Sequence, residues 1–507
     1  ISENSSSGLG CDARSVSKDL DDGCRANTLN SANMRLRLEP TINVAEMVRI
    51  HTQVDLFDNL VLGSNPDTAL LDPAVSGDAA LAGFTDSQAP PMASTSNSAR
   101  ASIVVKRAWA VVETPFGPLQ FGRMPNHWGL GLRANRGDCW DCDHGDNVDR
   151  VMFSTTLFGH KFGMGYDINS NGPTTLSVDS HASYMGGQGI DLETLDDVDE
   201  LFWIVGKMEP PDVVRDKIDR GQLVFNYGLY LTYRWQGFDY ARLDAADAPA
   251  VSATGASSAS PWATQFIERD MWMVTPDLWF KLLWKKLYIE FEGLIIAGKI
   301  GNASDAIAED SMDILQFGWA LRSSYKFLKD SLHVGMEVGM ASGDQAEPDN
   351  NDVNRRRWHP LGFNSRPTGT SPTRIDRDGA LNEFRFDHDY HVDLIMFRHI
   401  LGTVAGATYF KPWIQYFIVD SFGARLDMIY GLANEPVAFP GNSSNIGVEL
   451  DLNIFYRNEE EKFFAGLQYG VMFPLGALKR PEELFGEAFA DGADIAHVLR
   501  LNMMVRF

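Results

Sequence analysis

From residue 32 to the C-terminal end, apolar and polar side chains alternate at every second position, in segments of roughly ten residues. In 446–457, for example, Val448 and Leu450 share one face, whereas Glu449 and Asp451 share the other. Segments of this length match tilted strands that cross a bilayer, with one face toward lipid and one toward water. The pattern therefore predicts an all-β protein made of membrane-length antiparallel strands.

The connections between these segments decide between a membrane barrel and a soluble sandwich, which also alternates. Short turns such as 115–117 and 284–286 alternate along the chain with long polar connections. Outer-membrane barrels show short turns at one rim and long loops at the other. We therefore predict a transmembrane antiparallel up-and-down β-barrel with short periplasmic turns and long external loops. The long connections cover residues 59–99, 132–147, 169–198, 238–269, 344–405 and 476–494.

The number of strands follows from counting the alternating segments, of which the chain contains seventeen. Single-chain bacterial barrels have even strand numbers. We therefore predict an eighteen-stranded barrel whose first strand lies upstream of Ile1, with residues 1–31 as an external loop and 32–507 as the barrel. The alternative is a sixteen-stranded barrel in which 200–209 lies in a loop.

Composition limits the partners of the chain. Its 44 Lys and Arg residues against 68 Asp and Glu residues give a net charge of −24, which argues against nucleic acid. No stretch approaches the roughly 18 to 20 apolar residues of a spanning helix. Residues 1–10 lack the basic and apolar regions of a secretory signal, so we expect that signal to be removed or to lie outside this chain.

Charged side chains on the polar faces are predicted to line a water-filled lumen. Arg35, Arg37 and Arg49 are expected to approach Arg500 and Arg506 across the closure of the barrel as a basic ladder, opposite an acidic wall. Such opposed charges select permeants by charge and dipole; the alternative is a solvated wall without selectivity. The predicted pore-lining residues are Arg35, Arg37, Arg49, His51, Asp55, Arg150, Arg234, Glu290, Glu292, Arg322, Arg425, Asp427, Glu449, Asp451 and Arg500.

Cysteines occur four times, and their surroundings favour disulfides formed in an oxidising envelope. Cys139 and Cys142 form a C-x-x-C element. Because no second such element or His pair with ligand spacing follows, zinc is disfavoured and a loop-stapling disulfide is predicted. Cys11 and Cys24 are expected to form a second disulfide.

Two loops are rich in carboxylates, the ligands that calcium prefers. They contain Asp141, Asp143 and Asp146, and Asp349 and Asp352. Neither has the spacing of an EF-hand, so a solvated acidic loop is the alternative to a calcium site. We expect no other cofactor.

No catalytic residues are predicted. No G-x-S-x-G element accompanies any serine, and no nucleophile, base and acid stand in a recognisable pattern. The connection 344–405 is too long for a loop without structure or function of its own. We expect it to fold inward and narrow the pore, with an external flap as the alternative.

The last segment places Leu499, Leu501 and the terminal Phe507 on its apolar face. This ending resembles the C-terminal signature of bacterial outer-membrane barrels, which the insertion machinery reads. The resemblance implies that the chain contacts that machinery through Phe507 and then resides in the bacterial outer membrane, beside lipid and lipopolysaccharide.

Three further stretches carry a family resemblance. Residues 113–131, with Gly122-Arg123 and Trp128-Gly129, resemble the turn and following strand of porin-like and alginate-export-like barrels. The run 33–66, Asp138-Cys-Trp-Asp-Cys-Asp and Asp387-His-Asp-Tyr-His-Val-Asp-Leu resemble more closely an uncharacterised porin-like family of myxobacterial outer-membrane proteins. The resemblance implies a barrel with a passage and no particular substrate.

We therefore expect a porin-like channel for passive diffusion of small hydrophilic solutes or ions. One alternative is a closed barrel that acts as an adhesin or scaffold through loops such as 59–99 and 238–269. A second is a conduit for polysaccharide export, which requires a continuous cationic track in the lumen.

Overall fold

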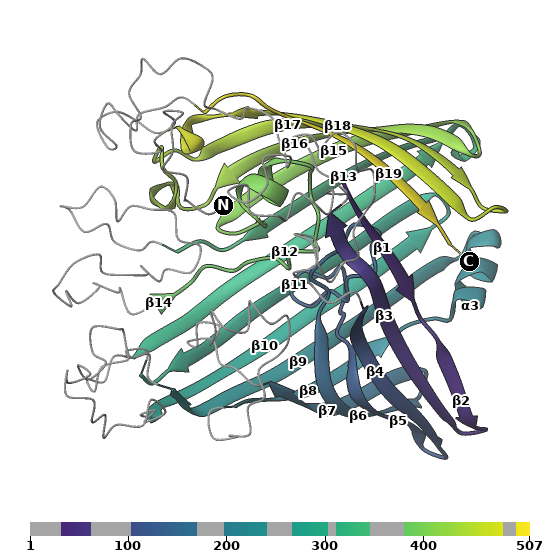
Figure 1. Cartoon of the computed structure of the whole chain (residues 1–507), viewed down its shortest axis with the longest axis vertical. Helices are drawn as coiled ribbons and strands as arrows, with labels where there is room; N and C mark the ends of the chain where they lie inside the picture. Colours follow the sequence, from purple (N-terminus) through teal and green to yellow (C-terminus); the bar gives the residue numbers. More distant parts are fainter. Residues whose placement is uncertain are drawn as a thin grey trace, which may run out of the picture.

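The computed structural model describes residues 32–61, 103–169, 197–240, 266–302, 311–344, 380–479 and 493–506. These residues form a 19-stranded sheet in which strands that follow one another in the chain pair antiparallel (Figure 1). The exceptions are β1 and β2, which both pair with β3, and the two-residue β14, which pairs parallel with β12. The all-β, up-and-down antiparallel architecture predicted from the alternation is confirmed.

The strands and helices have the following bounds. The first half of the sheet contains β1 (Asn33–Leu38), β2 (Thr41–Ala45), β3 (Val48–Val61), β4 (Ile103–Thr114), β5 (Gly117–Pro125), β6 (Asn147–Leu157), β7 (His160–Asn169), β8 (Val198–Lys207) and β9 (Leu223–Tyr240), with α3 (Pro211–Asp219) between the last two. The second half contains β10 (Phe266–Trp284), β11 (Leu287–Ile300), β12 (Met312–Phe327), β13 (Leu332–Ala341), β14 (Ala380–Leu381), β15 (Ala407–Val419), β16 (Phe422–Ala433), β17 (Asn445–Asn458), β18 (Phe463–Pro474) and β19 (Ala496–Val505). Short helical turns lie at η5 (Leu328–Asp330), η6 (Met396–Ile400), η7 (Pro436–Ala438) and η8 (Gly476–Leu478).

The beginning of the sheet differs from the prediction of one strand at 33–40. Both β1 and β2 pair with β3, so they form a single strand interrupted at Glu39 and Pro40. Proline has no backbone N–H to donate to the ladder, which explains the break. With β1 and β2 taken together and β14 set aside, the 19 strands reduce to the seventeen predicted ones.

The region around β8 differs from the sequence predictions in two ways. β8 pairs with β7 and β9, so the sixteen-stranded alternative that placed 200–209 in a loop is wrong. The following link contains α3, a helix that the alternation did not predict. Pro211 lies in its first turn and Asp212 is the acidic residue there, as is typical of a helix start.

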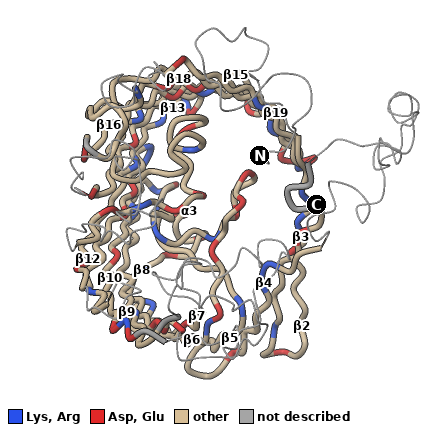
Figure 2. Tube along the Cα trace, turned by 60° about the vertical axis from the view of Figure 1, so that its left-hand side comes forward, with Lys and Arg blue, Asp and Glu red and all other residues tan. Residues whose placement is uncertain are grey.

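The sheet curls round so that its last strand lies beside its first strands. Figure 1 places β19 beside β1, and Figure 2 places it beside β3. The hairpin of β2 and β3, the hairpin of β4 and β5, and α3 lie at the same end of the molecule (Figure 1). The curled sheet thus separates an outer face from an enclosed inner face.

The two faces have the opposite character from those of a soluble protein. On β19, Leu499 and Leu501 point outward and are 70% and 66% exposed. On β17, Glu449 and Asp451 point inward and are 0% and 7% exposed. A large exposed apolar surface around a charged interior is the arrangement expected of a barrel in lipid. Among the described residues, no helix has the length and apolar character needed to span a bilayer.

Candidate functional site

Two segments outside the spanning strands pack against the inner face of the sheet, and we treat them together as the candidate site. The cysteine loop is residues 126–146, between β5 and β6. The aromatic segment is residues 380–406, between β13 and β15, and forms the described end of the predicted constricting connection 344–405; residues 345–379 lie outside the described residues.

The aromatic segment supplies ten of the 23 buried residues in the largest apolar cluster of the described structure. Phe386 packs edge-to-face on Tyr390, with ring centroids 5.2 Å apart. The hydroxyl groups of Tyr390 and of Tyr409 on β15 donate to Glu337 on β13 at 2.8 and 2.7 Å. The segment is therefore held to the inner wall by apolar burial and by a hydrogen-bonded carboxylate. The cluster members from the segment are Phe384, Phe386, Tyr390, Val392, Leu394, Ile395, Met396, Phe397, Leu401 and Val404.

One wall carboxylate, Glu449 on β17, binds the backbone of the aromatic segment. It accepts hydrogen bonds from the N–H groups of Leu394, Ile395 and Met396 at 3.0, 2.8 and 2.7 Å. Successive N–H groups at the start of a helical turn are good partners for an anion, and here they begin η6. Glu449 thus replaces the water that these donors would otherwise need.

The cysteine loop is bound by the same kind of contact to another strand, β11. Glu292 on β11 accepts hydrogen bonds from the N–H groups of Leu130, Gly131 and Leu132, the last two at 2.9 and 3.2 Å. Gly131 has a φ of +86°, a left-handed conformation that turns these N–H groups toward one acceptor. Two predicted pore-lining glutamates therefore anchor interior segments instead of facing open water.

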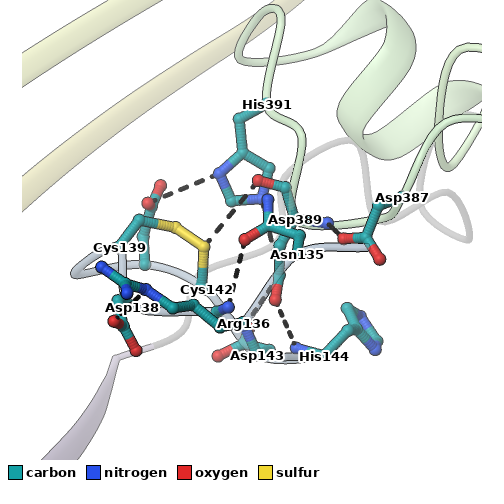
Figure 3. The surroundings of a disulfide bond; sticks show 12 residues. Asn135, Arg136, Asp138, Cys139, Cys142, Asp143, His144, Asp387, Asp389 and His391 are labelled. Atoms are coloured by element: carbon teal, nitrogen blue, oxygen red, sulfur yellow. Dashed lines mark hydrogen bonds and ion pairs between the residues drawn. A yellow bond between two sulfur atoms is a disulfide. The ribbon is translucent and has the colours of Figure 1, made fainter. Parts of the chain in front are cut away.

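The tip of the cysteine loop is closed by the predicted disulfide between Cys139 and Cys142, whose Cα atoms lie 5.1 Å apart. The aromatic segment reaches it through Asp389, which accepts from the N–H groups of Asp143 and His144 at 3.0 Å each (Figure 3). The Asp389 carbonyl oxygen lies 3.8 Å from the Cys142 sulfur. The two interior segments therefore meet at the disulfide.

The same tip joins the first strands of the sheet to the last. Asp143 pairs with Arg35 of β1 at 2.6 Å. Asp141 pairs with Arg398 of the aromatic segment at 2.5 Å and lies 3.8 Å from Arg500 of β19. Acidic groups of the loop thus stand between the arginines predicted to form a bare basic ladder across the closure.

Two further members of that predicted ladder, Arg37 and Arg49, also differ from the expectation. Arg37 pairs with Asp55 at 2.7 Å, and Arg49 pairs with Glu113. Each arginine lies beside a carboxylate on a neighbouring strand, so its charge is balanced locally. The basic ladder is therefore corrected to a series of ion pairs.

Most other predicted pore-lining residues form ion pairs, several of them between residues that lie opposite each other on neighbouring strands. Arg150 pairs with Asp167 at 2.6 Å and Arg322 with Glu337 at 3.1 Å in this way, whereas Arg425 pairs at 2.6 Å with Asp427 of its own strand, β16. Opposite charges on neighbouring strands stabilise a sheet. The others have these partners: Arg234 pairs with Glu200, Glu290 lies near Lys281 and accepts from the Trp279 indole, Asp451 accepts from the Leu394 N–H, and His51 stacks on Trp109.

A cavity of about 470 Å³ lies between the aromatic segment and the inner wall. Its wall includes Lys411, whose ammonium donates to the Val392 carbonyl and lies 3.6 Å from Asp427. Both signs of charge border it. The charged lining residues are Asp141, Arg322, Glu337, Asp393, Arg398, Lys411, Arg425, Asp427 and Asp451.

Burial and charge shift the pKa of several carboxyls in the two segments. Burial raises the pKa of Asp393 to about 8, and the nearby charge of Glu449 adds to this shift. Burial and the charge of Asp146 likewise raise the pKa of Asp387 to about 8. Burial also acts on Asp141, but its hydrogen bond with His391 and the charge of Arg398 outweigh it and hold that pKa well below its usual range. Asp141 therefore responds to pH with the opposite sign from Asp387 and Asp393.

The predicted calcium ligands in the cysteine loop each have a separate partner. Asp141 and Asp143 pair with arginines, and Asp146 accepts from the Asn135 N–H at 3.0 Å. Calcium stays a prediction. Cys11, Cys24, Asp349, Asp352 and Phe507 lie outside the described residues.

The sequence prediction missed several residues that shape the site. The sequence contains a signal for some of them and none for the others. Asp167 and Glu200 follow from strand register, because a hairpin turn at 158–160 fixes Asp167 opposite Arg150. Asp389 and Arg398 carry no such signal, since they act in a segment whose partners are distant in sequence.

Comparisons with known proteins add distant structural likeness. No family model matches the chain, and no curated protein does either, so the myxobacterial resemblance stays an expectation. Among solved structures, Pseudomonas aeruginosa OccK9 is similar at 11% identity, covering 90% of this chain and 84% of that chain with a TM-score of 0.40. A BenF-like porin from Pseudomonas fluorescens Pf-5 has 10% identity, 87% and 85% coverage and a TM-score of 0.40, and Acinetobacter baumannii OccAB4 has 10%, 86%, 83% and 0.36. At this level of likeness, the function has to be argued from the chain's own residues.

Proposed function

We propose that this protein is an integral β-barrel of a bacterial outer membrane and that it serves as a channel for passive diffusion of small hydrophilic solutes or ions. The observation that carries the proposal is that the sheet has an apolar outer face and a charged inner face, the reverse of a soluble protein. Exposed apolar side chains such as Leu499 and Met503 form its outer face, and buried charges such as Arg150 and Glu449 form its inner face. Burying so many charges in a dry core is costly, whereas a wet lumen accommodates them.

In this proposal the aromatic segment and the cysteine loop narrow the lumen to a passage beside the inner wall. The cavity at Lys411 and Asp427 is a part of that passage. Its walls carry ion pairs that create a transverse field, which favours small solutes with charge or a strong dipole. The paired charges also argue against a continuous cationic track, and hence against polysaccharide export.

Conductance through a planar bilayer tests the proposal. The full chain, purified in detergent and folded as judged by heat-modifiable migration, is expected to give discrete current steps in salt solution. Heat-denatured protein in the same detergent is the control and gives none. A folded protein that inserts and carries no current contradicts the channel function while leaving the fold intact.

A second candidate function is a closed barrel that acts as an adhesin or scaffold through its external loops. The observation that favours it is the extent to which the two segments fill the interior, with Phe386, Met396 and Phe397 almost completely buried. This candidate predicts no current together with specific binding of a partner to intact cells.

Residence in the outer membrane is tested separately. The protein is expected to fractionate with outer-membrane lipid and lipopolysaccharide and to need detergent for extraction. We propose that insertion depends on the terminal Phe507, so that its removal lowers the yield of folded protein in the membrane. Extraction as a compact monomer into plain buffer contradicts the membrane assignment.

A further inference from the structure

The disulfide of the cysteine loop has a histidine of the aromatic segment beside it. The ligand atoms of Cys139, Cys142 and His391 all lie within 4.8 Å of one another. Across the described part of the chain, no other group of three His, Cys, Asp or Glu side chains converges in this way. Figure 3 shows His391 directed toward the sulfur atoms from the opposite segment. Two sulfurs and one imidazole are the ligand types that zinc prefers.

The oxidised pair does not offer these ligands, because the thiolate is the form of cysteine that binds metal. Two molecules of a low-molecular-weight thiol supply the two electrons and two protons that cleave the disulfide, and they leave joined as their own disulfide. Cys139 and Cys142 are then free thiols. Binding of a divalent ion to both sulfurs releases their two protons.

We propose that the reduced form of this protein binds one zinc-class divalent cation through Cys139, Cys142 and His391. A tetrahedral zinc ion with bonds of about 2.3 Å to sulfur and about 2.0 Å to nitrogen separates its ligand atoms by about 3.5 to 4 Å. The three ligand atoms already lie within 4.8 Å of one another, so small side-chain rotations suffice. Water or a neighbouring carboxylate completes the coordination.

The surroundings of His391 orient its ring for this role. Its Nδ1 atom lies 3.2 Å from a guanidinium nitrogen of Arg398 and 3.4 Å from a carboxylate oxygen of Asp141. Carboxylates beside the non-coordinating nitrogen are the usual support of metal-binding histidines. With the ring proton on Nδ1, toward Asp141, the Nε2 lone pair is available to the metal; Nε2 lies 4.0 Å from a carboxylate oxygen of Asp389.

Metal binding would couple the two interior segments directly. The disulfide closes only a loop within the cysteine loop, whereas the metal joins that loop to His391 of the aromatic segment. The proposal does not depend on the channel function, because it concerns a property of the folded chain.

Cobalt binding to the reduced protein tests the proposal. The full chain, carrying Cys11→Ser and Cys24→Ser so that only one cysteine pair remains, is reduced with a water-soluble phosphine in detergent and titrated with Co²⁺. The expected result is one Co²⁺ per chain, with a thiolate-to-cobalt charge-transfer band, tetrahedral d–d bands and displacement by Zn²⁺. The oxidised protein is expected to show none of these bands.

Variants decide whether the site is the one proposed. Cys139→Ser with Cys142→Ser is expected to abolish the charge-transfer band, and His391→Gln to weaken Co²⁺ binding at least tenfold. The matched control His388→Gln, an exposed histidine of the same segment whose Nδ1 pairs with the Gly402 carbonyl, is expected to change affinity less than twofold. Heat-modifiable migration confirms that each variant is folded.

Hydrogen exchange distinguishes binding that includes His391 from binding by the two cysteines alone. Zinc is expected to slow hydrogen exchange in residues 389–393 of the reduced parent protein and not of the His391→Gln variant. A reduced parent protein without a one-to-one cobalt complex overturns the proposal. So does a folded His391→Gln variant that binds cobalt as tightly as the parent.

Discussion

The cysteine loop and the aromatic segment occupy the same interior but are held there by different forces. The aromatic segment buries a continuous apolar cluster and adds one wall carboxylate, Glu449. The cysteine loop relies more on polar contacts, with Glu292 at one end and Arg35, Asp389 and a disulfide at the other. The comparison shows that a charged lumen can anchor chain either by apolar burial beside the wall or by charges of the wall itself.

Removing the aromatic segment should have the largest effect. Replacing residues 382–404 by a short Gly-Ser linker takes away the larger of the two interior segments, so single-channel conductance is expected to rise several-fold. The measurement is the current step in a planar bilayer, after heat-modifiable migration has shown a folded barrel. An unchanged step in the folded variant would show that this segment does not restrict the passage.

Loss of the Glu449 contact should release the same segment without deleting it. Glu449→Ala leaves the buried N–H groups of Ile395 and Met396 without an acceptor and leaves Leu394 only its contact with Asp451, at a cost of about 3 kcal/mol in docking free energy. Faster hydrogen exchange in 393–400 is expected, with the cysteine loop unchanged. Glu459→Gln, on the exposed turn that follows β17, is the matched control and should leave both segments protected.

Alkaline pH should loosen the aromatic segment partially. A carboxyl whose folded-state pKa is raised stabilises the folded state fully below its unfolded pKa of about 4, and this stabilisation is lost as the pH rises through the folded value. For Asp393 that value is about 8, so exchange in 393–398, corrected for the intrinsic rate, should be faster at pH 9 than at pH 6. Asp393→Asn should remove most of the difference; an equal pH effect in that variant would assign it to other groups.

The pKa of Asp141 is lowered, so its contribution to the cysteine loop has the opposite sign. That contribution is present above the unfolded pKa of about 4 and is lost as the pH falls further. Acid should therefore loosen the contact between Asp141 and Arg398, whereas alkali should loosen the segment around Asp393.

Breaking the disulfide should have the smallest effect of the set. Cys139→Ser with Cys142→Ser opens a very short loop, for which the chain-entropy estimate is about 2 kcal/mol. Faster exchange is expected in 136–144 and not in the apolar core of the aromatic segment. Conductance should stay close to that of the parent, because Glu292 still holds 130–132; a large increase would show that the disulfide anchors the whole loop.

Much of the fold could be predicted because strand alternation is a local property. Each turn position fixes the register of its hairpin, so even the pairing of Arg150 with Asp167 was within reach of the sequence. The break at Pro40 was missed because it depends on a single residue inside an otherwise alternating stretch, and the helix α3 was missed because it lies in a connection between strands, where strand alternation gives no signal. Pairing of Cys139 with Cys142 was predictable from their spacing and polar surroundings.

The sequence by itself determined which side of each strand meets lipid. Because apolar residues occupy every second position, only the alternate, polar residues can face inward. It also determined that the inner wall carries both signs of charge. Only the tertiary structure decided that Glu292 and Glu449 bind backbone N–H groups, and that His391 lies at the disulfide. These contacts join segments far apart in the chain, and periodicity holds no information about which loop folds back onto which wall.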